Sequence, residues 1–251
     1  MGYELCASLR KFLIEQGDEY RDMQALVDAI LFKYNNDVFE RVIYTESHDE
    51  VANGKARVPE EIEPRNADSF FGKKRAILGL VITLTSPGIP MLFQGQEFIE
   101  DEYFKDSEAL DWSQQEKHIG ITRMVSDLIK IRTEQKNESE GLKGQYTKVI
   151  HFDNDNKILA YARSANEDFA NSSIIVLNLS NNSFENFEFG IPYAKQYNLV
   201  FNSDWKDYDE EFTDMEVTTI TISNDEYNGE ACKAVTNLPA YTALIFTPEN
   251  N

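Results

Sequence analysis

The spacing of hydrophobic residues changes once along this chain of 251 residues. This change restricts the possible folds more than any other feature of the sequence. Up to about residue 136, apolar side chains recur every three or four positions, as between Met23 and Tyr34, which predicts helices that bury one face. After residue 144, apolar and polar residues alternate, which is typical of strands. The polar, turn-like stretch 137–141 separates the two patterns. We therefore predict two domains, residues 1–136 and residues 137–251.

The first domain is predicted to alternate helices with short apolar strands. Strands are expected at residues 41–45 and 91–93, and a polar loop follows each of them. The first of these loops, residues 50–68, leads to a helix that Asp68 or Ser69 can cap. This order of helices and strands, with long loops after the strands, indicates α/β architecture.

The second domain is predicted to be all-β. Turn-forming Asn, Asp and Gly residues separate about eight short segments of alternating polarity, which suggests an antiparallel β-sandwich or barrel. The expected strands are 146–152, 157–164, 173–179, 184–189, 196–201, 216–222, 230–236 and 241–247.

Charge and composition exclude several classes of partner. A net charge of −20 opposes binding to nucleic acid or to an anionic membrane surface, but it leaves neutral ligands such as sugars unaffected. With two distant cysteines and three histidines, we expect no metal site, and no cofactor is predicted. No apolar run reaches the roughly 18 residues of a membrane span. The first residues do not resemble a signal peptide, so a cytoplasmic location is expected.

Polar side chains follow both predicted strands of the first domain. Glu46, His48 and Asp49 come after the first strand, and Gln94 and Glu97 come after the second. In parallel barrels the C-terminal ends of the strands carry the chemistry. Carboxylates, amides and an imidazole at this edge suit a polyhydroxylated ligand. The alternative is that these are solvated acidic loops, with the His-Asp pair as a local capping arrangement.

Two motifs in this region carry a resemblance. Residues 46–55, Glu-Ser-His-Asp-Glu-Val-Ala-Asn-Gly-Lys, resemble the fourth signature region of the alpha-amylase family of glycoside hydrolases, and its branching-type members in particular. The pattern Gly88-x-Pro90-x-x-Phe93-x-Gly95-x-Glu97 resembles the same family at barrel strand eight, and residues 104–112 are similar to the stretch that follows. The β-rich tail falls where that family carries its C-terminal β-sandwich.

The resemblance implies a fold and a role for each site residue. The chain would hold strands seven and eight of a (β/α)8 barrel, followed by an antiparallel β-sandwich. Asp49 matches the catalytic carboxylate that stabilises the transition state, and His48 matches the histidine that binds hydroxyls of the sugar at the cleavage point. Glu46 and Glu97 are further candidates for substrate binding. For Glu97, holding the strand-eight loop through backbone hydrogen bonds is an equal alternative, and Gly88 and Gly95 are expected to serve backbone geometry.

The nucleophile and the acid/base carboxylate of a retaining glycosidase belong to strands four and five in this family, and no residue here matches them. We therefore expect either the C-terminal part of a longer enzyme or a stand-alone remnant. The chain alone should not cleave or transfer glucan, and its unpaired strands should promote self-association.

Three functions remain open from the sequence. The resemblance favours 1,4-alpha-glucan branching, a retaining glycosyl transfer on α-1,4-glucans. An alternative within the family is hydrolysis of α-glucans or of a trehalose-terminated glucan. A different class is a non-catalytic glucan-binding module, whose sugar platform could use aromatic residues of the second domain such as Tyr193, Tyr197, Trp205 and Tyr208.

Overall fold

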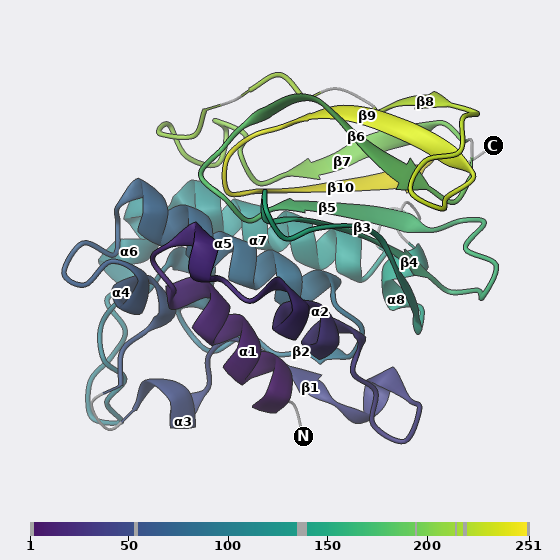
Figure 1. Ribbon diagram of the computed structural model, residues 1–251. Coiled ribbons are helices and arrows are strands. Elements are labelled where there is room, and N and C mark those ends of the chain that lie inside the picture. The colour runs from purple at the N-terminus through teal and green to yellow at the C-terminus, as the bar shows by residue number, and fades with distance from the viewer. Residues whose placement is uncertain are drawn as a thin grey trace. The chain divides into compact units, whose positions relative to one another are not determined.

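A computed structural model describes residues 3–52, 55–134, 140–193, 195–213, 215–217 and 220–249 (Figure 1). The chain forms two compact units, Met1–Ser126 with Lys206–Phe212, and Asp127–Trp205 with Thr213–Asn251. The boundary predicted between residues 136 and 137 lies outside the described residues. The grouping of Lys206–Phe212 with the first unit has no counterpart in the sequence prediction, which placed this segment in the second domain.

The first unit is mainly helical, as the spacing of its apolar residues predicts. Its elements are α1 (Tyr3–Ile14), η1 (Asp18–Tyr20), α2 (Met23–Leu31), η2 (Val38–Glu40), β1 (Val42–Ile43), α3 (His48–Val51), α4 (Val58–Ile62), α5 (Phe70–Thr85), β2 (Ile89–Pro90), η3 (Gln96–Phe98), α6 (Trp112–Lys117) and the first half of α7 (Ile119–Arg132).

Strands β1 and β2 are parallel and hydrogen-bonded to each other, with Val42 paired to Ile89. Helix α5 connects them, so the three elements form a β-α-β unit, which the sequence order predicted. Among the described residues no further strand joins this pair. The strand predicted at 91–93 is wrong in position. The paired residues are Ile89 and Pro90, and Met91 still donates its N–H to the Ile43 carbonyl at 2.8 Å. The apolar run continues to Leu92 and Phe93, which lie beyond the pairing.

Helix α5 begins where the sequence predicts. The Ser69 hydroxyl accepts a hydrogen bond from the Gly72 N–H at 2.9 Å, so Ser69, and not Asp68, is the capping residue. Every residue of α5 from Gly72 to Thr85 is buried. A helix buried on all sides must be covered by several elements, which for α5 include α1 and α4.

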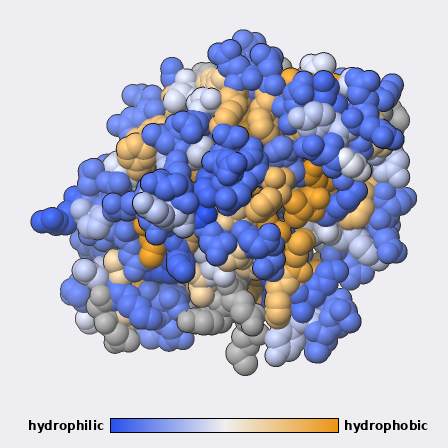
Figure 2. Space-filling view, viewed as in Figure 1, coloured by the Kyte–Doolittle hydropathy of each residue, from blue (hydrophilic) through white to orange (hydrophobic). Residues whose placement is uncertain are grey.

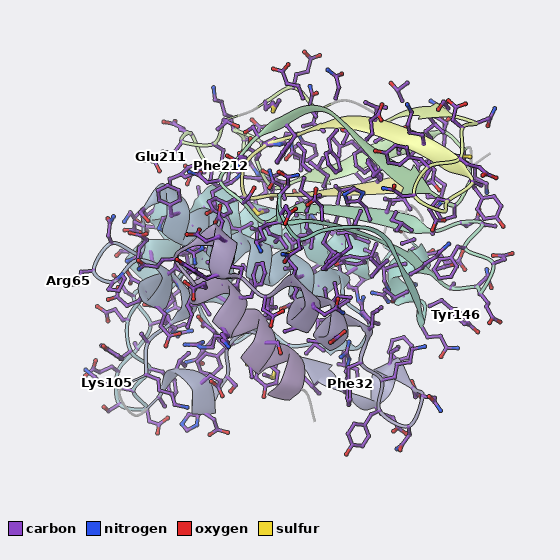
Figure 3. All side chains as sticks on the ribbon, viewed as in Figure 1. Phe32, Arg65, Lys105, Tyr146, Glu211 and Phe212 are labelled. Carbon is purple, nitrogen blue, oxygen red and sulfur yellow. The ribbon has the colours of Figure 1, made fainter. Side chains whose placement is uncertain are left out.

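Segment Lys206–Phe212 belongs to the surroundings of α5. Lys73 Nζ lies 2.6 Å from an Asp209 carboxylate oxygen and 2.7 Å from a Glu211 carboxylate oxygen, and Lys74 Nζ lies 4.7 Å from the centre of the Phe212 ring. Figure 3 shows Glu211 and Phe212 close to α5. These contacts help to compensate the charges of two lysines that are buried in a mainly apolar helix.

The first strand is tied to helix α2 by Arg41. Its guanidinium donates to the carbonyls of Ala29 and Ile30 at 2.7 Å each, and to the carbonyl of Pro87. The guanidinium also lies 6.0 Å from the ring of Phe32, which Figure 3 labels just after α2. The last carbonyls of a helix lack partners within the helix, and here a side chain supplies them. Arg41 thereby fixes where β1 starts.

The second unit is all-β apart from the end of α7 and the short helix α8 (Glu140–Lys143). One sheet has the order β3-β4-β5-β10-β7 and the other has the order β6-β9-β8, and all pairs are antiparallel. The strands are β3 (Tyr146–Asp153), β4 (Ile158–Ser164), β5 (Ser173–Asn178), β6 (Phe184–Ile191), β7 (Tyr197–Asn202), β8 (Thr221–Ser223), β9 (Cys232–Leu238) and β10 (Thr242–Pro248).

The sequence therefore predicted all eight strands. The one expected at 216–222 is shorter, and residues 218 and 219 of it lie outside the described residues. Both sheets contribute to a single core, with Ala160 of β4 and Phe246 of β10 on one side and Phe189 of β6 and Ala234 of β9 on the other. Two antiparallel sheets that share one core form a β-sandwich, and the predicted all-β class is confirmed.

The surface is mostly hydrophilic in the view of Figure 2, as expected of a chain with 44 acidic and 24 basic residues, although hydrophobic patches interrupt it. No helix within the described ranges is long and apolar enough to cross a membrane.

Candidate active site

The loops that follow β1 and β2 start from the same edge of the two-stranded sheet, because parallel strands have their C-terminal ends together. The first loop leads into α3, which starts at His48. The second loop carries Phe93 and Phe104. The rings of His48 and Phe104 are 5.4 Å apart and nearly perpendicular, and the rings of Phe104 and Phe93 are 5.3 Å apart. The structure therefore brings the predicted His48 next to the second loop.

Asp49 and His48 face solvent. The Asp49 side chain is 94% exposed and that of His48 is 56% exposed, and His48 Nδ1 lies 3.5 Å from Asp49 Oδ1. Lys55 donates to the main-chain carbonyl of Asp49 at 2.8 Å. Both side chains are thus held on a short helix at a strand end and are accessible to a ligand.

Glu46 is placed differently, since its side chain is almost completely buried. Its Oε1 accepts a hydrogen bond from the Val58 N–H at 2.6 Å, and its Oε2 accepts one from Arg57 Nη1 at 2.9 Å. Burial raises the pKa of Glu46, while Arg57 and the Val58 N–H act in the opposite direction. Both carboxylate oxygens face protein donors, so direct binding of substrate by Glu46 stays a prediction without geometric support.

Arg57 is a site residue that the sequence did not reveal. In addition to Glu46, its guanidinium donates to the carbonyl of Gln94 at 2.9 Å and to that of Glu102 at 3.4 Å. Its central carbon lies 4.9 Å from the centre of the Phe93 ring. A single arginine in a polar loop belongs to no periodic pattern, and its partners are 37 and 45 residues away along the chain.

Glu97 accepts a hydrogen bond from the Gly95 N–H at 3.0 Å, which corresponds to the loop-holding role that the sequence left open beside sugar contact. Gly95 has φ +90° and Gly88 has φ +134°. These values favour glycine, and a Cβ on Gly95 would lie 2.7 Å from the Cβ of Glu100. The expectation that both glycines serve backbone geometry is confirmed.

Gln96 connects the two strand ends beneath the site. Its side-chain nitrogen donates to the Thr45 hydroxyl at 2.7 Å, and its side-chain oxygen accepts from the Phe93 N–H at 2.7 Å. A small cavity adjoins this bridge. Its lining contains the polar Thr45, Glu46, Gln96 and Glu100 and the apolar Val58, Pro59, Ala76, Leu80 and Ile99. Burial raises the pKa of Glu100. The floor of the site thus combines hydrogen-bonded polar groups with apolar side chains.

Two further observations concern metal-ligand groups and the predicted aromatic platform. Within the described residues no three or more His, Cys, Asp or Glu side chains are grouped so that they could hold a metal ion. Of the aromatic residues proposed for a sugar platform, Tyr197 and Tyr208 are buried, and Tyr208 belongs to the first unit. Tyr197 and Tyr208 therefore cannot offer a ring face to a sugar, because their rings are buried. Tyr193 is 39% exposed and Trp205 is partly exposed, so a platform at these two residues stays a prediction.

The fold of the second unit has a known counterpart. Residues 149–249 match the family model described as "Alpha amylase, C-terminal all-beta domain". The sandwich, together with the His48-Asp49 motif at a parallel strand end, makes this chain similar to the C-terminal portion of alpha-amylase-family enzymes.

The named relatives of similar sequence include 1,4-alpha-glucan branching enzymes from several bacteria. The enzyme from Pseudomonas syringae pv. tomato is 29% identical over 215 residues, which cover 84% of this chain and 28% of that enzyme. The enzyme from Bacillus cereus (strain B4264) is 26% identical over 245 residues, which cover 94% of this chain and 36% of that enzyme. These matches confirm the resemblance to the alpha-amylase family. The chain spans about a third or less of the length of these two relatives.

Solved structures share the fold. The debranching enzyme from Nostoc punctiforme aligns with a TM-score of 0.62 and 16% identity, covering 98% of this chain and 46% of that one. Pullulanase from Anoxybacillus sp. LM18-11, complexed with maltotetraose, aligns with a TM-score of 0.61 and 15% identity, covering 98% and 34%. The alpha-amylase from H. orenii aligns with a TM-score of 0.59 and 18% identity, covering 96% and 48%.

Proposed function

We propose that this chain forms part of a 1,4-alpha-glucan branching enzyme. Residues 1–136 would supply strands seven and eight of its (β/α)8 barrel, with β1 and β2 as these two strands, and residues 137–251 would form its C-terminal β-sandwich. The observation that carries this proposal is the exposed His48-Asp49 pair at the C-terminal end of a parallel strand, beside Phe104 of the neighbouring loop.

The proposed chemistry assigns a task to each exposed side chain. Cleavage of an α-1,4 bond builds positive charge on the glucose ring, and the Asp49 carboxylate would stabilise that charge. His48 would hydrogen-bond hydroxyls of the same ring, and the edge of the Phe104 ring keeps the imidazole in place. The nucleophile and the acid/base carboxylate that the retaining mechanism also requires are not assigned to residues of this chain.

The proposed substrate is an α-1,4-glucan. Such a chain is neutral, so the net charge of −20 does not repel it. The named relatives are 1,4-alpha-glucan branching enzymes, and a pullulanase of similar fold holds maltotetraose. Both observations support a maltooligosaccharide-like ligand at the strand-end loops.

The test is to measure new α-1,6 branches in amylose treated with the complete enzyme that contains this sequence. Asp49→Asn should abolish branching because it removes the negative charge but keeps the shape. Asp155→Asn, at an exposed aspartate in the turn after β3, is the matched control and should retain full activity. Branching by the Asp49→Asn enzyme at the unmodified rate would refute the proposal.

The same assay separates branching from hydrolysis within the family. A branching enzyme forms new α-1,6 linkages and leaves the number of reducing ends nearly unchanged, whereas a hydrolase of α-glucans releases new ends. A hydrolase of trehalose-terminated glucans releases new ends only when a trehalose-terminated maltooligosaccharide replaces amylose as the substrate. Reducing ends without new branches would reassign the enzyme to hydrolysis.

The 251-residue chain on its own is proposed to lack turnover and to self-associate. Val42 in β1 and Ile89 in β2 are exposed apolar residues on a sheet that has two strands within the described part of the chain, and such edges pair with other chains. Light scattering should show species larger than a monomer at micromolar concentration. A monodisperse monomer would contradict the proposed association.

A further inference from the structure

Arg57 is 1% exposed, although a guanidinium is charged at every pH that proteins tolerate. Burying such a group is costly unless charge and hydrogen bonds compensate it. The four partners that compensate Arg57 are the Glu46 carboxylate, two main-chain carbonyls and the Phe93 ring. A side chain with this many close partners holds in place the loops to which these partners belong.

The partners come from both loops of the site. Glu46 precedes α3 in the first loop, and the same carboxylate holds the N–H of Val58 where α4 begins. The ring of Phe93 and the carbonyls of Gln94 and Glu102 belong to the second loop. Arg57 therefore joins the two loops through one planar group with fixed donor directions.

A chain of aromatic contacts continues from this group to the exposed pair. The guanidinium contacts the Phe93 ring, Phe93 contacts Phe104 edge-on at 5.3 Å, and Phe104 contacts the His48 ring at 5.4 Å. Figure 3 shows Lys105, the neighbour of Phe104, at the end of the molecule where α3 lies in Figure 1. A change in the position of the guanidinium would thus reach the imidazole through two rings.

We propose that Arg57 is a positioning residue: through its buried pair with Glu46 and its contact with Phe93, it sets where His48 and Asp49 lie relative to the second loop. Glu46 then acts through Arg57 and does not touch the sugar. This inference rests on the proposed function in one respect: it takes His48 and Asp49 to serve catalysis.

Lysine cannot replace Arg57 in this role. An ammonium group offers a point charge in place of a planar fork, so it can keep the ion pair with Glu46 but not the contacts to both carbonyls and to the ring face. Arg57→Lys therefore separates the positioning role from the charge. A suitable control is Arg21→Lys, because Arg21 is also buried, paired with Asp18 and placed over a ring, that of Phe12, away from the strand ends.

The first readout is the ring signals of His48 in proton-carbon NMR spectra of the 251-residue chain, whose shifts report the ring current of Phe104. Arg57→Lys should move them, and Arg21→Lys should leave them unchanged. The second readout is kcat and KM for branching in the complete enzyme, where Arg57→Lys should lower kcat about 10- to 100-fold with a smaller change in KM. Unchanged His48 signals together with unchanged kcat would overturn the inference.

A second variant keeps the inference testable if Arg57→Lys does not fold. Phe93→Leu retains the Glu46–Arg57 pair and removes the ring that lies between the Arg57 guanidinium and Phe104. It should shift the His48 signals and lower kcat, and normal values of both would overturn the inference. Failure of the proposed function can be told apart from failure of the positioning role. If only the proposed function is wrong, Asp49→Asn leaves branching intact, while the His48 signals still respond to Arg57→Lys.

Discussion

Arg57 and Glu46 form an ion pair of 2.9 Å between Nη1 and Oε2, and both side chains are almost completely removed from solvent. Buried pairs of this kind add little net stability compared with apolar residues, but breaking one leaves an uncompensated charge. The pair therefore matters mainly for what it holds in place, namely the loop before α3 and the loop after β2.

Removal of one partner should destabilise the first unit strongly. We expect Glu46→Ala to lower the free energy of unfolding by about 3–5 kcal/mol, because the Arg57 charge stays buried without its counter-charge. Urea unfolding followed by tryptophan fluorescence measures this change. The exposed Glu19→Ala serves as control and should change stability by less than about 0.5 kcal/mol. A loss below about 1 kcal/mol for Glu46→Ala would show that the pair relaxes into solvent.

Asp68 should make stability depend on acid pH. Although partial burial opposes it, hydrogen bonds from Lys117 and His118 hold the pKa of Asp68 below its ordinary value. A lowered folded-state pKa means that this carboxylate stabilises the fold above its unfolded pKa of about 3.9, and that the contribution is lost as pH falls through the folded value. The stability difference between the wild type and Asp68→Asn should therefore shrink on acidification. A difference that stays constant down to about pH 2 would contradict this assignment.

Both cysteines should be unreactive in the folded chain. Cys6 and Cys232 are buried and unpaired, and burial raises the pKa of Cys6 to about 12 and also raises that of Cys232. The thiolate is the reactive form, so almost none is present at neutral pH. Titration with a thiol reagent should detect neither thiol natively and both in denaturant. Rapid native labelling of Cys6 would indicate that α1 opens.

Alanine at Gly95 should disturb the second loop. The residue has φ +90°, and its new Cβ would meet the Glu100 Cβ at 2.7 Å, so we expect a loss of about 1–3 kcal/mol. Gly229→Ala is a matched control, because Gly229 also has a positive φ, of +79°, but no atom lies within 4 Å of the added Cβ. Thermal unfolding should rank Gly95→Ala as the more damaging change. Equal effects would mean that backbone strain alone matters.

The sequence predicted those parts of the fold that depend on periodic burial. The eight strands of the second unit followed from alternation, and the start of α5 followed from Ser69 as a cap. The second parallel strand was misplaced because Leu92 and Phe93 are apolar although the pairing ends before them. Local patterns show which residues are apolar, but pairing depends on the register between distant segments.

The sequence predicted the candidate site in part. His48 and Asp49 were found through a motif, and the structure places them exposed at a strand end. Arg57 was missed, because its importance arises from partners that only the folded chain brings together. The burial of Glu46 was missed for the same reason, since a glutamate in an acidic segment gives no sign that both its oxygens are occupied.

The most direct test of the central claim is a structure of the complete enzyme with a bound maltooligosaccharide. We expect a glucose ring against His48, with a ring hydroxyl within hydrogen-bonding distance of the imidazole, about 3 Å, and with the Asp49 carboxylate facing the anomeric carbon. A glucan chain bound in the catalytic cleft with Asp49 turned away from the sugar would contradict it.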